Sequence, residues 1–145
     1  MSVTVDANVL LYASDEASPF RDQARLRLDD LTRGPDLVYV FWPVVIAYVR
    51  ISTHPSVFDS PLALDRAIAN VERLLALPHI QVVGEQSRFW RGFRAVALDA
   101  QVRGNLVSDA HLVALMKENG VRSIWTHDRD FRRFPGIDVR DPFAS

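Results

Sequence analysis

The sequence contains no cysteine. This absence excludes disulfide bonds, thiolate metal sites and cysteine nucleophiles together, and it is typical of a protein in a reducing compartment. Long apolar stretches are also missing, because the longest run, 38–49, is interrupted by Pro43 and is too short to cross a bilayer. Residues 1–6 carry an acid and no basic residue, which argues against a secretory signal. We therefore expect a cytoplasmic protein with no membrane segment.

Lysine is nearly absent, since all of the 17 basic residues except Lys117 are arginine. The 18 acidic residues bring the net charge to −1, so the overall charge does not indicate a nucleic-acid binder. Arginine suits bidentate contacts with phosphate. It also replaces lysine throughout proteins from GC-rich genomes, so the composition leaves both interpretations open.

Short apolar runs alternate with helical patterns along the chain. Runs rich in β-branched residues predict strands at 3–5, 37–40, 80–83 and 123–126. Apolar spacing and start signals predict helices at 18–31, 42–53, 60–75, 87–100 and 109–119. We therefore predict an α/β fold, one domain spanning 1–145, in which helices cover both faces of a mainly parallel sheet.

Three aspartates are expected at one edge of this sheet. Asp6 follows the first predicted strand, Asp128 follows strand 123–126, and Asp109 lies in the first turn of a helix that Ser108 is expected to cap. The carboxyl ends of the strands form the ligand-binding edge of an open α/β sheet. A crossover helix begins at that same edge. We therefore expect Asp6, Asp109 and Asp128 to converge there.

Converging carboxylates repel one another, so in isolation one or two of them would stay protonated. A hard divalent cation such as Mg²⁺ or Mn²⁺ removes that cost, and it activates water for attack on a phosphoryl group. Taken singly, Asp109 is equally typical of a helix-dipole partner, and Asp128 of a turn. Asp6 needs a partner because it ends a buried strand. It is the combination that predicts a metal site.

Four motifs occur in order along nearly the whole chain. They are V-D-A-N-V-L-L-Y from Val5, H-P-S-V-F from His54, G-N-L-V-S-D-A-H-L from Gly104, and T-H-D-R-D-F from Thr126. Together they resemble the PIN-domain nucleases, and specifically the VapC toxins of bacterial type II toxin–antitoxin systems. The resemblance implies a PIN-like three-layer fold with a central sheet of about four to five strands. It also implies endonucleolytic cleavage of RNA that depends on Mg²⁺, for which Mn²⁺ substitutes.

The resemblance assigns roles to individual residues. Asp6, Asp109 and Asp128 match the catalytic, metal-binding acids of the family, and Asn8 and Asn105 match the polar positions that accompany them. For both asparagines, a turn or a helix cap explains the residue equally well.

Partners follow from the same resemblance. It implies a cognate VapB-like antitoxin that blocks the metal site with its C-terminal segment, an RNA substrate, and a homodimer for which the apolar helix 42–49 offers a surface. One role open to Asp130 is to assist Asp128. Because Phe131 follows it, we expect Asp130 to belong to a structural turn outside the site.

One position departs from the family pattern. The helix after the second strand usually carries a motif like E-F-L-R, and here it reads Ala47-Tyr48-Val49-Arg50. Ala47 therefore stands where a glutamate is expected, and we predict activity from a three-acid site with weaker or altered metal binding. The alternative is a PIN-like module that binds RNA or protein with little or no catalysis.

Arginines near these acids are candidates for contacts with phosphate. Arg50 and Arg129 are expected to reach the cleft. Arg88, Arg91 and Arg94 recur on one side of the helix 87–100, where phosphate binding and a solvated helix face both remain open. Stacking on RNA bases is one possible role for the three tryptophans, but they lie within apolar patterns and we expect them to pack in the core; they are Trp42, Trp90 and Trp125.

Two other phosphoryl-transfer classes also place an acid after the first strand. A haloacid-dehalogenase-like phosphatase needs D-x-D, whereas this chain reads Asp6-Ala7-Asn8 and so has Asn8 in place of the second aspartate. A response-regulator receiver domain needs an aspartate after its third strand, where this chain has Gly84 followed by Glu85. Both classes are excluded.

Overall fold

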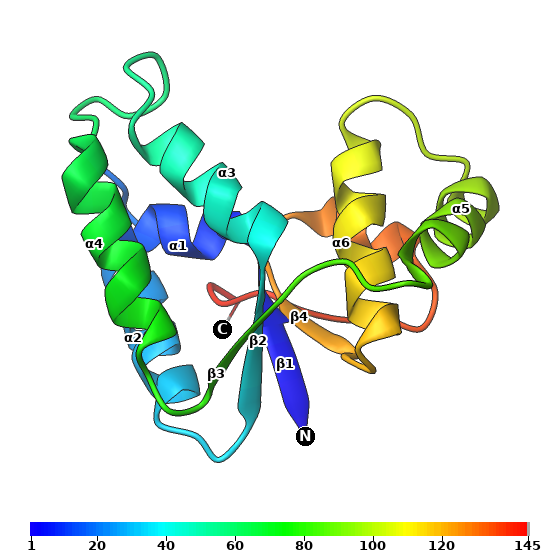
Figure 1. Ribbon diagram of the computed structural model, residues 1–145. Coiled ribbons are helices and arrows are strands. Elements are labelled where there is room, and N and C mark those ends of the chain that lie inside the picture. The colour runs from blue at the N-terminus through cyan, green and yellow to red at the C-terminus, as the bar shows by residue number, and fades with distance from the viewer. Residues whose placement is uncertain (145) are drawn as a thin grey trace.

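Five parallel strands form the central sheet of the computed structural model, which describes residues 1–144 (Figure 1). They are β1 (Ser2–Val5), β2 (Leu37–Phe41), β3 (Ile80–Val83), β4 (Ser123–Trp125) and β5 (Asp138–Arg140), in the order β3-β2-β1-β4-β5. Every neighbouring pair is parallel. Parallel sheets are covered on both faces, and Val3, Val40 and Ile124 are accordingly at most 1% exposed.

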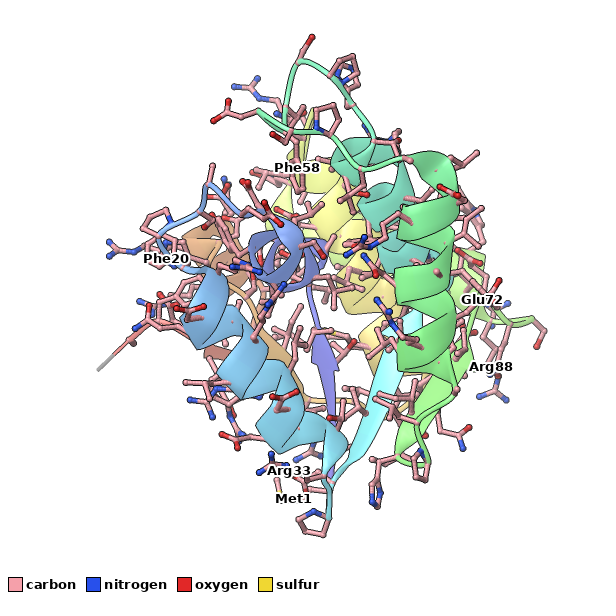
Figure 2. All side chains as sticks on the ribbon, turned by 90° about the vertical axis from the view of Figure 1, so that its left-hand side faces the viewer. Met1, Phe20, Arg33, Phe58, Glu72 and Arg88 are labelled. Atoms are coloured by element: carbon pink, nitrogen blue, oxygen red, sulfur yellow. The ribbon has the colours of Figure 1, made fainter. Side chains whose placement is uncertain are left out.

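Within residues 1–144, six α-helices cover the two faces of the sheet. One side carries α1 (Ala7–Ser14), α2 (Arg21–Thr32), α3 (Trp42–Ser52) and α4 (Leu64–Leu75), and the other carries α5 (Phe89–Ala100) and α6 (Leu106–Glu118), as Figure 1 shows. Figure 2 looks onto the first of these layers, with β1 and β2 behind it. The predicted α/β fold of three layers is confirmed. None of the helices in this described part is long and apolar enough to cross a membrane.

A buried hydroxyl group ties three helices of the first layer together. Tyr48 of α3 is 3% exposed, and its Oη lies 2.7 Å from Oγ of Ser14 at the end of α1. The same Oη accepts a hydrogen bond from Nδ2 of Asn70 in α4 at 3.0 Å. Buried polar groups need such partners. Both α1 and α4 are therefore fixed to α3.

Two elements, α1 and β5, are absent from the sequence prediction. Helix α1 has buried residues on more than one of its sides, so its sequence shows no single apolar stripe at the helical period. These buried residues are Ala7, Val9, Leu10 and Ala13. Strand β5 is a short edge strand that pairs only with β4, and its residues are charged at both ends. Short charged strands are typical of protected sheet edges and give a weak sequence signal.

The start of α6 also differs from the prediction. The helix begins at Leu106, so Ser108 lies inside the helix and the expected cap at Ser108 is wrong. Asn105 occupies the position before the helix, although its side chain makes no capping hydrogen bond. Asp109 still falls in the first turn. Helix α6 thus begins earlier than predicted, whereas the helices predicted at 18–31, 60–75 and 87–100 begin two to four residues later than predicted, at Arg21, Leu64 and Phe89.

The expected burial of the tryptophans is wrong for two of the three. Trp42 is 46% exposed and Trp90 is 67% exposed. Trp125 is half-buried at the end of β4, and the guanidinium carbon of Arg27 lies 4.1 Å from its ring centroid, which is a cation–π contact. Periodicity alone does not separate these positions, because each tryptophan adjoins residues that do enter the core.

The sheet topology positions the functional site. Strand β1 lies between β2 and β4, so the chain connections leave it in opposite directions on its two sides. Ligands bind beyond the carboxyl ends of the strands at such a switch point. Val5 pairs with Trp125 in register, so the residues that follow β1 and β4 are neighbours.

Candidate metal centre

Asp6 leaves β1 directly and caps the helix that follows. Its backbone N–H donates to the carbonyl oxygen of Trp125 at 3.0 Å, which extends the pairing of β1 with β4 by one residue. Oδ1 of Asp6 accepts a hydrogen bond from the backbone N–H of Ala7 at 2.7 Å. Oδ2 accepts one from Oγ1 of Thr126 at 2.8 Å. Both carboxylate oxygens are therefore held in place.

Burial raises the pKa of Asp6 above its usual value of 3.8, because the charged form loses hydration. The hydrogen bonds from Thr126 and Ala7 act in the opposite direction, and the nearby charge of Asp128 adds to the rise. The hydrogen bonds from Thr126 and Ala7 therefore stabilise the ionised form of Asp6, which burial disfavours.

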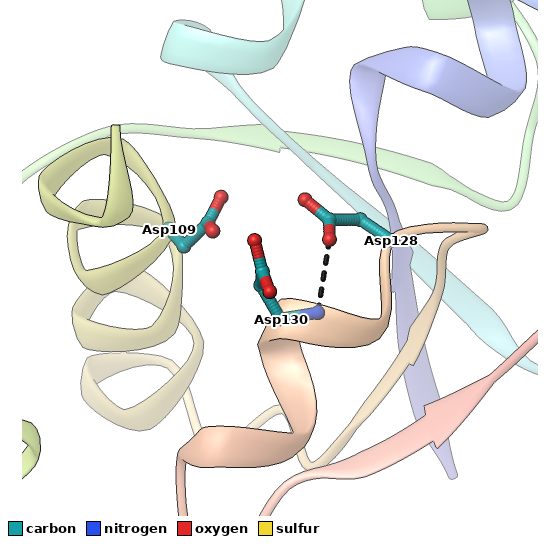
Figure 3. A group of neighbouring side chains, drawn as sticks. All are labelled: Asp109, Asp128 and Asp130. Atoms are coloured by element: carbon teal, nitrogen blue, oxygen red, sulfur yellow. Dashed lines mark hydrogen bonds between the residues drawn. The ribbon is translucent and has the colours of Figure 1, made fainter. Parts of the chain in front are cut away.

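Asp128 and Asp130 lie at the start of the short 3₁₀ helix η1 (Arg129–Arg133), which follows β4. Oδ1 of Asp128 accepts a hydrogen bond from the backbone N–H of Asp130 at 2.9 Å, shown as a dashed line in Figure 3. The backbone N–H of Asp128 donates to Oγ1 of Thr126 at 3.0 Å. The threonine hydroxyl thus joins the carboxylate of Asp6 to the backbone of Asp128.

Three carboxylates face one another across the gap between α6 and η1 (Figure 3). Each of Asp109, Asp128 and Asp130 offers one oxygen, and these oxygens lie within 4.8 Å of one another. We expected Asp130 to belong to a structural turn outside the site; the turn of η1 does include it, and it brings the Asp130 carboxylate close to those of Asp109 and Asp128. Oxygen donors at this spacing fit a hard divalent cation.

The pKa of Asp109 is raised to about 7. Burial is the largest cause, and the negative charges of Asp128, Asp6 and Asp130 add to it in that order. Without a cation, Asp109 therefore holds a proton over much of the range below neutral pH. A carboxyl group whose pKa is strongly perturbed by burial together with neighbouring charges is typical of functional sites.

A cleft of about 480 Å³ opens above these acids. Among the predicted site residues, it is lined by Asp6, Asn8, Arg50, Asp109 and Asp128, and Ala47 contributes to its wall. The structure therefore brings together the three predicted acids, one of the two asparagines and one of the two cleft arginines. Asn105 and Arg129 are exposed and do not line the cleft.

Two groups at the site were not identified from the sequence. One is the buried Thr126 hydroxyl, for which the only signal is its place two residues before Asp128. The other is a pair at the cleft wall, in which Nε2 of His111 lies 2.6 Å from Oε1 of Glu85. This hydrogen bond lowers the pKa of Glu85. Because Glu85 is 26 positions away from His111 in the sequence, spacing does not reveal the contact.

Comparison with known protein families matches residues 3–137 to the PIN domain. Ribonuclease VapC48 of Mycobacterium tuberculosis is 49% identical over 144 residues, which cover 99% of each chain. Ribonuclease VapC37 of the same organism is 37% identical over 140 residues, with 97% of this chain and 96% of the relative covered. The chain therefore belongs to the PIN-domain family, among the VapC ribonucleases, and the predicted family is confirmed.

Solved structures with much lower sequence identity have the same fold. VapBC2 from Rickettsia felis, bound to a DNA fragment of its promoter, gives a TM-score of 0.72 at 12% identity, over 97% of this chain and 98% of that one. The Sarcin-Ricin loop cleaving toxin VapC20 of M. tuberculosis gives 0.67 at 15% identity, over 94% and 98%. The predicted PIN-like arrangement is thus shared across distant sequences.

The raised pKa of Asp109 predicts a pH-dependent stability. Between pH about 4 and about 7 the folded protein holds a proton that the unfolded chain releases, so the free energy of unfolding falls as the pH rises. In metal-free protein at pH 8, Asp109→Asn removes this penalty and is expected to raise the free energy of unfolding by about 1–2 kcal/mol, a value reduced for solvent screening. Urea denaturation at pH 8 measures this difference in the free energy of unfolding. Asp22→Asn on the exposed face of α2 is the control, and equal stability of Asp109→Asn and wild type at pH 8 contradicts the prediction.

The Thr126 hydroxyl predicts a second measurable effect. Thr126→Val removes the donor to Oδ2 of Asp6, so the pKa of Asp6 should rise further above its usual value, while Thr126→Ser should keep it near the wild-type value. NMR titration of the Asp6 carboxyl carbon in metal-free protein reports the change. An unshifted Asp6 in the valine variant refutes the positioning role of Thr126.

Proposed function

We propose that this chain is the toxin of a toxin–antitoxin pair and acts as an endoribonuclease that depends on Mg²⁺ or Mn²⁺. Two observations of one region carry the proposal: oxygens of Asp109, Asp128 and Asp130 lie within 4.8 Å of one another, and Asp6, Asp109 and Asp128 line one cleft. The names of its relatives, which are VapC ribonucleases, support the reaction class. RNA is the proposed substrate.

The proposed metal ligands and catalytic residues are Asp6, Asp109 and Asp128, and Asp130 joins them because of its oxygen in the same cluster. When bound, a divalent cation supplies a Lewis acid for the phosphoryl group and a water of lowered pKa. The chain itself supplies orientation: Thr126 and Ala7 fix the carboxylate of Asp6, and the N–H of Asp130 fixes that of Asp128.

Other residues of the cleft bind and place the substrate in this proposal. Arg50 is exposed on the cleft wall, and its guanidinium group suits a phosphate of the RNA backbone. Asn8 donates from Nδ2 to Oγ1 of Thr126 at 3.2 Å, so it supports the same hydroxyl group that holds Asp6. Asn105 and Arg129 do not line the cleft, and we assign them no role in the reaction.

A VapB-like antitoxin is the proposed protein partner, since solved structures with this fold include VapBC complexes from R. felis and from Haemophilus influenzae. We also propose a homodimer through α3. The support is an exposed apolar surface on that helix, where Trp42 is 46% and Ile46 is 62% exposed. Exposed apolar patches of this kind mark interaction surfaces.

Cleavage of a structured RNA in the presence of Mn²⁺ tests the proposal. Asp109→Asn and Asp128→Asn should each lower the rate by about 100-fold, because each removes a charged oxygen from the cluster. Asp36→Asn at the opposite edge of the sheet is the matched control and should cleave like wild type. Equal cleavage by all variants indicates a contaminating nuclease. No cleavage by the wild type favours the alternative function, a binding module without catalysis.

The position of Ala47 predicts that a carboxylate introduced there increases the affinity for metal. Because its side chain lines the cleft wall, Ala47→Glu adds a carboxylate facing the acids and should tighten Mn²⁺ binding by about tenfold, or about 1.4 kcal/mol. Ala47→Gln has nearly the same size without the charge and should leave the affinity near that of wild type. Titration calorimetry measures both variants, and an unchanged affinity in Ala47→Glu counts against an available ligand position at this wall.

A further inference from the structure

The outer face of α5 carries exposed cations around an exposed aromatic ring. We define the α5 patch as Arg88, Trp90, Arg91 and Arg94, all of them exposed, with Trp90 at 67%. Arg88 projects from the right margin of Figure 2. A single exposed apolar residue needs no explanation, but an indole ring among arginines presents a stacking surface within a positive field.

The charges of the α5 patch are not neutralised by ion pairs. The ion pairs among residues 1–144 join other groups, and none includes Arg88, Arg91 or Arg94. The whole chain carries a net charge of −1, so this positive surface is local. A local cluster of free guanidinium groups attracts an anionic partner.

A row of aromatic rings connects the α5 patch to the cleft. The centroid of Trp90 lies 5.6 Å from that of Phe93, and Phe93 lies 6.0 Å from Phe89. Phe89 in turn lies 5.1 Å from the ring of His111, which lines the cleft with Asp109. Ring contacts therefore run from Trp90 of the patch to His111 at the cleft wall.

A second hollow adjoins the patch on its other side. This hollow of about 660 Å³ between α5 and α6 is lined by Arg88, Arg91 and Lys117 together with Asp99 and Glu118. Gly92 stands at its rim, and a Cβ atom at that position would meet nothing within 4 Å. Cations outnumber acids in this lining, so the positive surface continues from the convex face of α5 into a concave one.

We propose that the α5 patch binds single-stranded RNA beyond the cleavage cleft, with a base stacked on Trp90 and phosphates bound by Arg91 and Arg94. Base stacking combined with cationic contacts is how proteins hold single strands without reading their sequence. A second copy of the chain is a poorer occupant, because two-fold pairing of this surface would set arginines against arginines. The inference rests on the proposed function, since it names how the same substrate is held.

Affinity for a fluorescently labelled single-stranded RNA of about 12 nucleotides, measured by anisotropy in EDTA, tests the α5 patch apart from cleavage. Trp90→Ala should weaken binding by about tenfold, and Trp90→Phe should restore most of the affinity. Arg94→Gln should reduce the slope of log affinity against log salt by about 0.7, the value for one phosphate contact on a single strand. Leu26→Ala, an exposed apolar residue of α2, and Arg122→Gln, before β4, are the matched controls.

Cleavage kinetics add a readout that a structural defect would not mimic. With long RNA and Mn²⁺, Trp90→Ala should raise KM and leave kcat unchanged, whereas a misfolded variant would lower kcat. RNA binding that is identical in Trp90→Ala and wild type overturns the proposal, as does a Trp90→Ala protein that loses only its oligomeric state in light scattering.

The two proposals fail in different ways. Cleavage that is insensitive to Trp90 overturns the α5 patch alone. RNA binding that depends on Trp90, without any cleavage by the wild type, supports the α5 patch and overturns the proposed ribonuclease activity. Wild-type protein that neither binds nor cleaves RNA overturns both.

Discussion

The parallel pairing of β1 with β4 determines where the carboxylates of the site lie. Val5 stands opposite Trp125, so Asp6 and Thr126 emerge side by side. The Thr126 hydroxyl gives its one proton to Asp6 and accepts from the N–H of Asp128 and the amide of Asn8. This uses the full hydrogen-bonding capacity of a hydroxyl group. A shift of one residue in the register between β1 and β4 would turn these side chains to opposite faces of the sheet and separate the groups of the site.

Bringing several carboxylates together in a partly buried cleft destabilises their ionised forms, and the surrounding structure must offset this cost. Burial and three neighbouring acids raise the pKa of Asp109 to about 7, so the site opposes its own ionisation. The surrounding structure holds the acids together in spite of this. Asp109 is fixed by its place in the first turn of α6, and Phe131 of η1 is 1% exposed and anchors the turn that carries Asp128 and Asp130. Well-packed neighbours and poorly tolerated charges are characteristic of sites selected for function over stability.

Much of this architecture follows from local patterns. The strand ends and the helix start were enough to predict that Asp6, Asp109 and Asp128 share one edge, and the motifs were enough to predict the family. Asp130 was missed because its direction depends on the η1 turn. Thr126 was missed because its partner lies 120 positions away. The exposure of Trp90 depends on which side of α5 meets α6, and apolar periodicity does not settle that. Asn105 and Arg129 do not line the cleft, since a place in or beside a motif does not by itself bring a side chain to it.

Helix α1 is held at both ends, by Asp6 and Thr126 where it begins and by the Ser14–Tyr48–Asn70 contacts where it finishes. Its eight residues span only about 12 Å, so it acts as a short rigid strut between the cleft and the outer helices. Substitutions in α4 are therefore not independent of the acids, although α4 does not line the cleft. A change in the position of α4 during evolution requires compensating changes in α3 and α1, and we expect the contacting residues of these three helices to vary together among relatives.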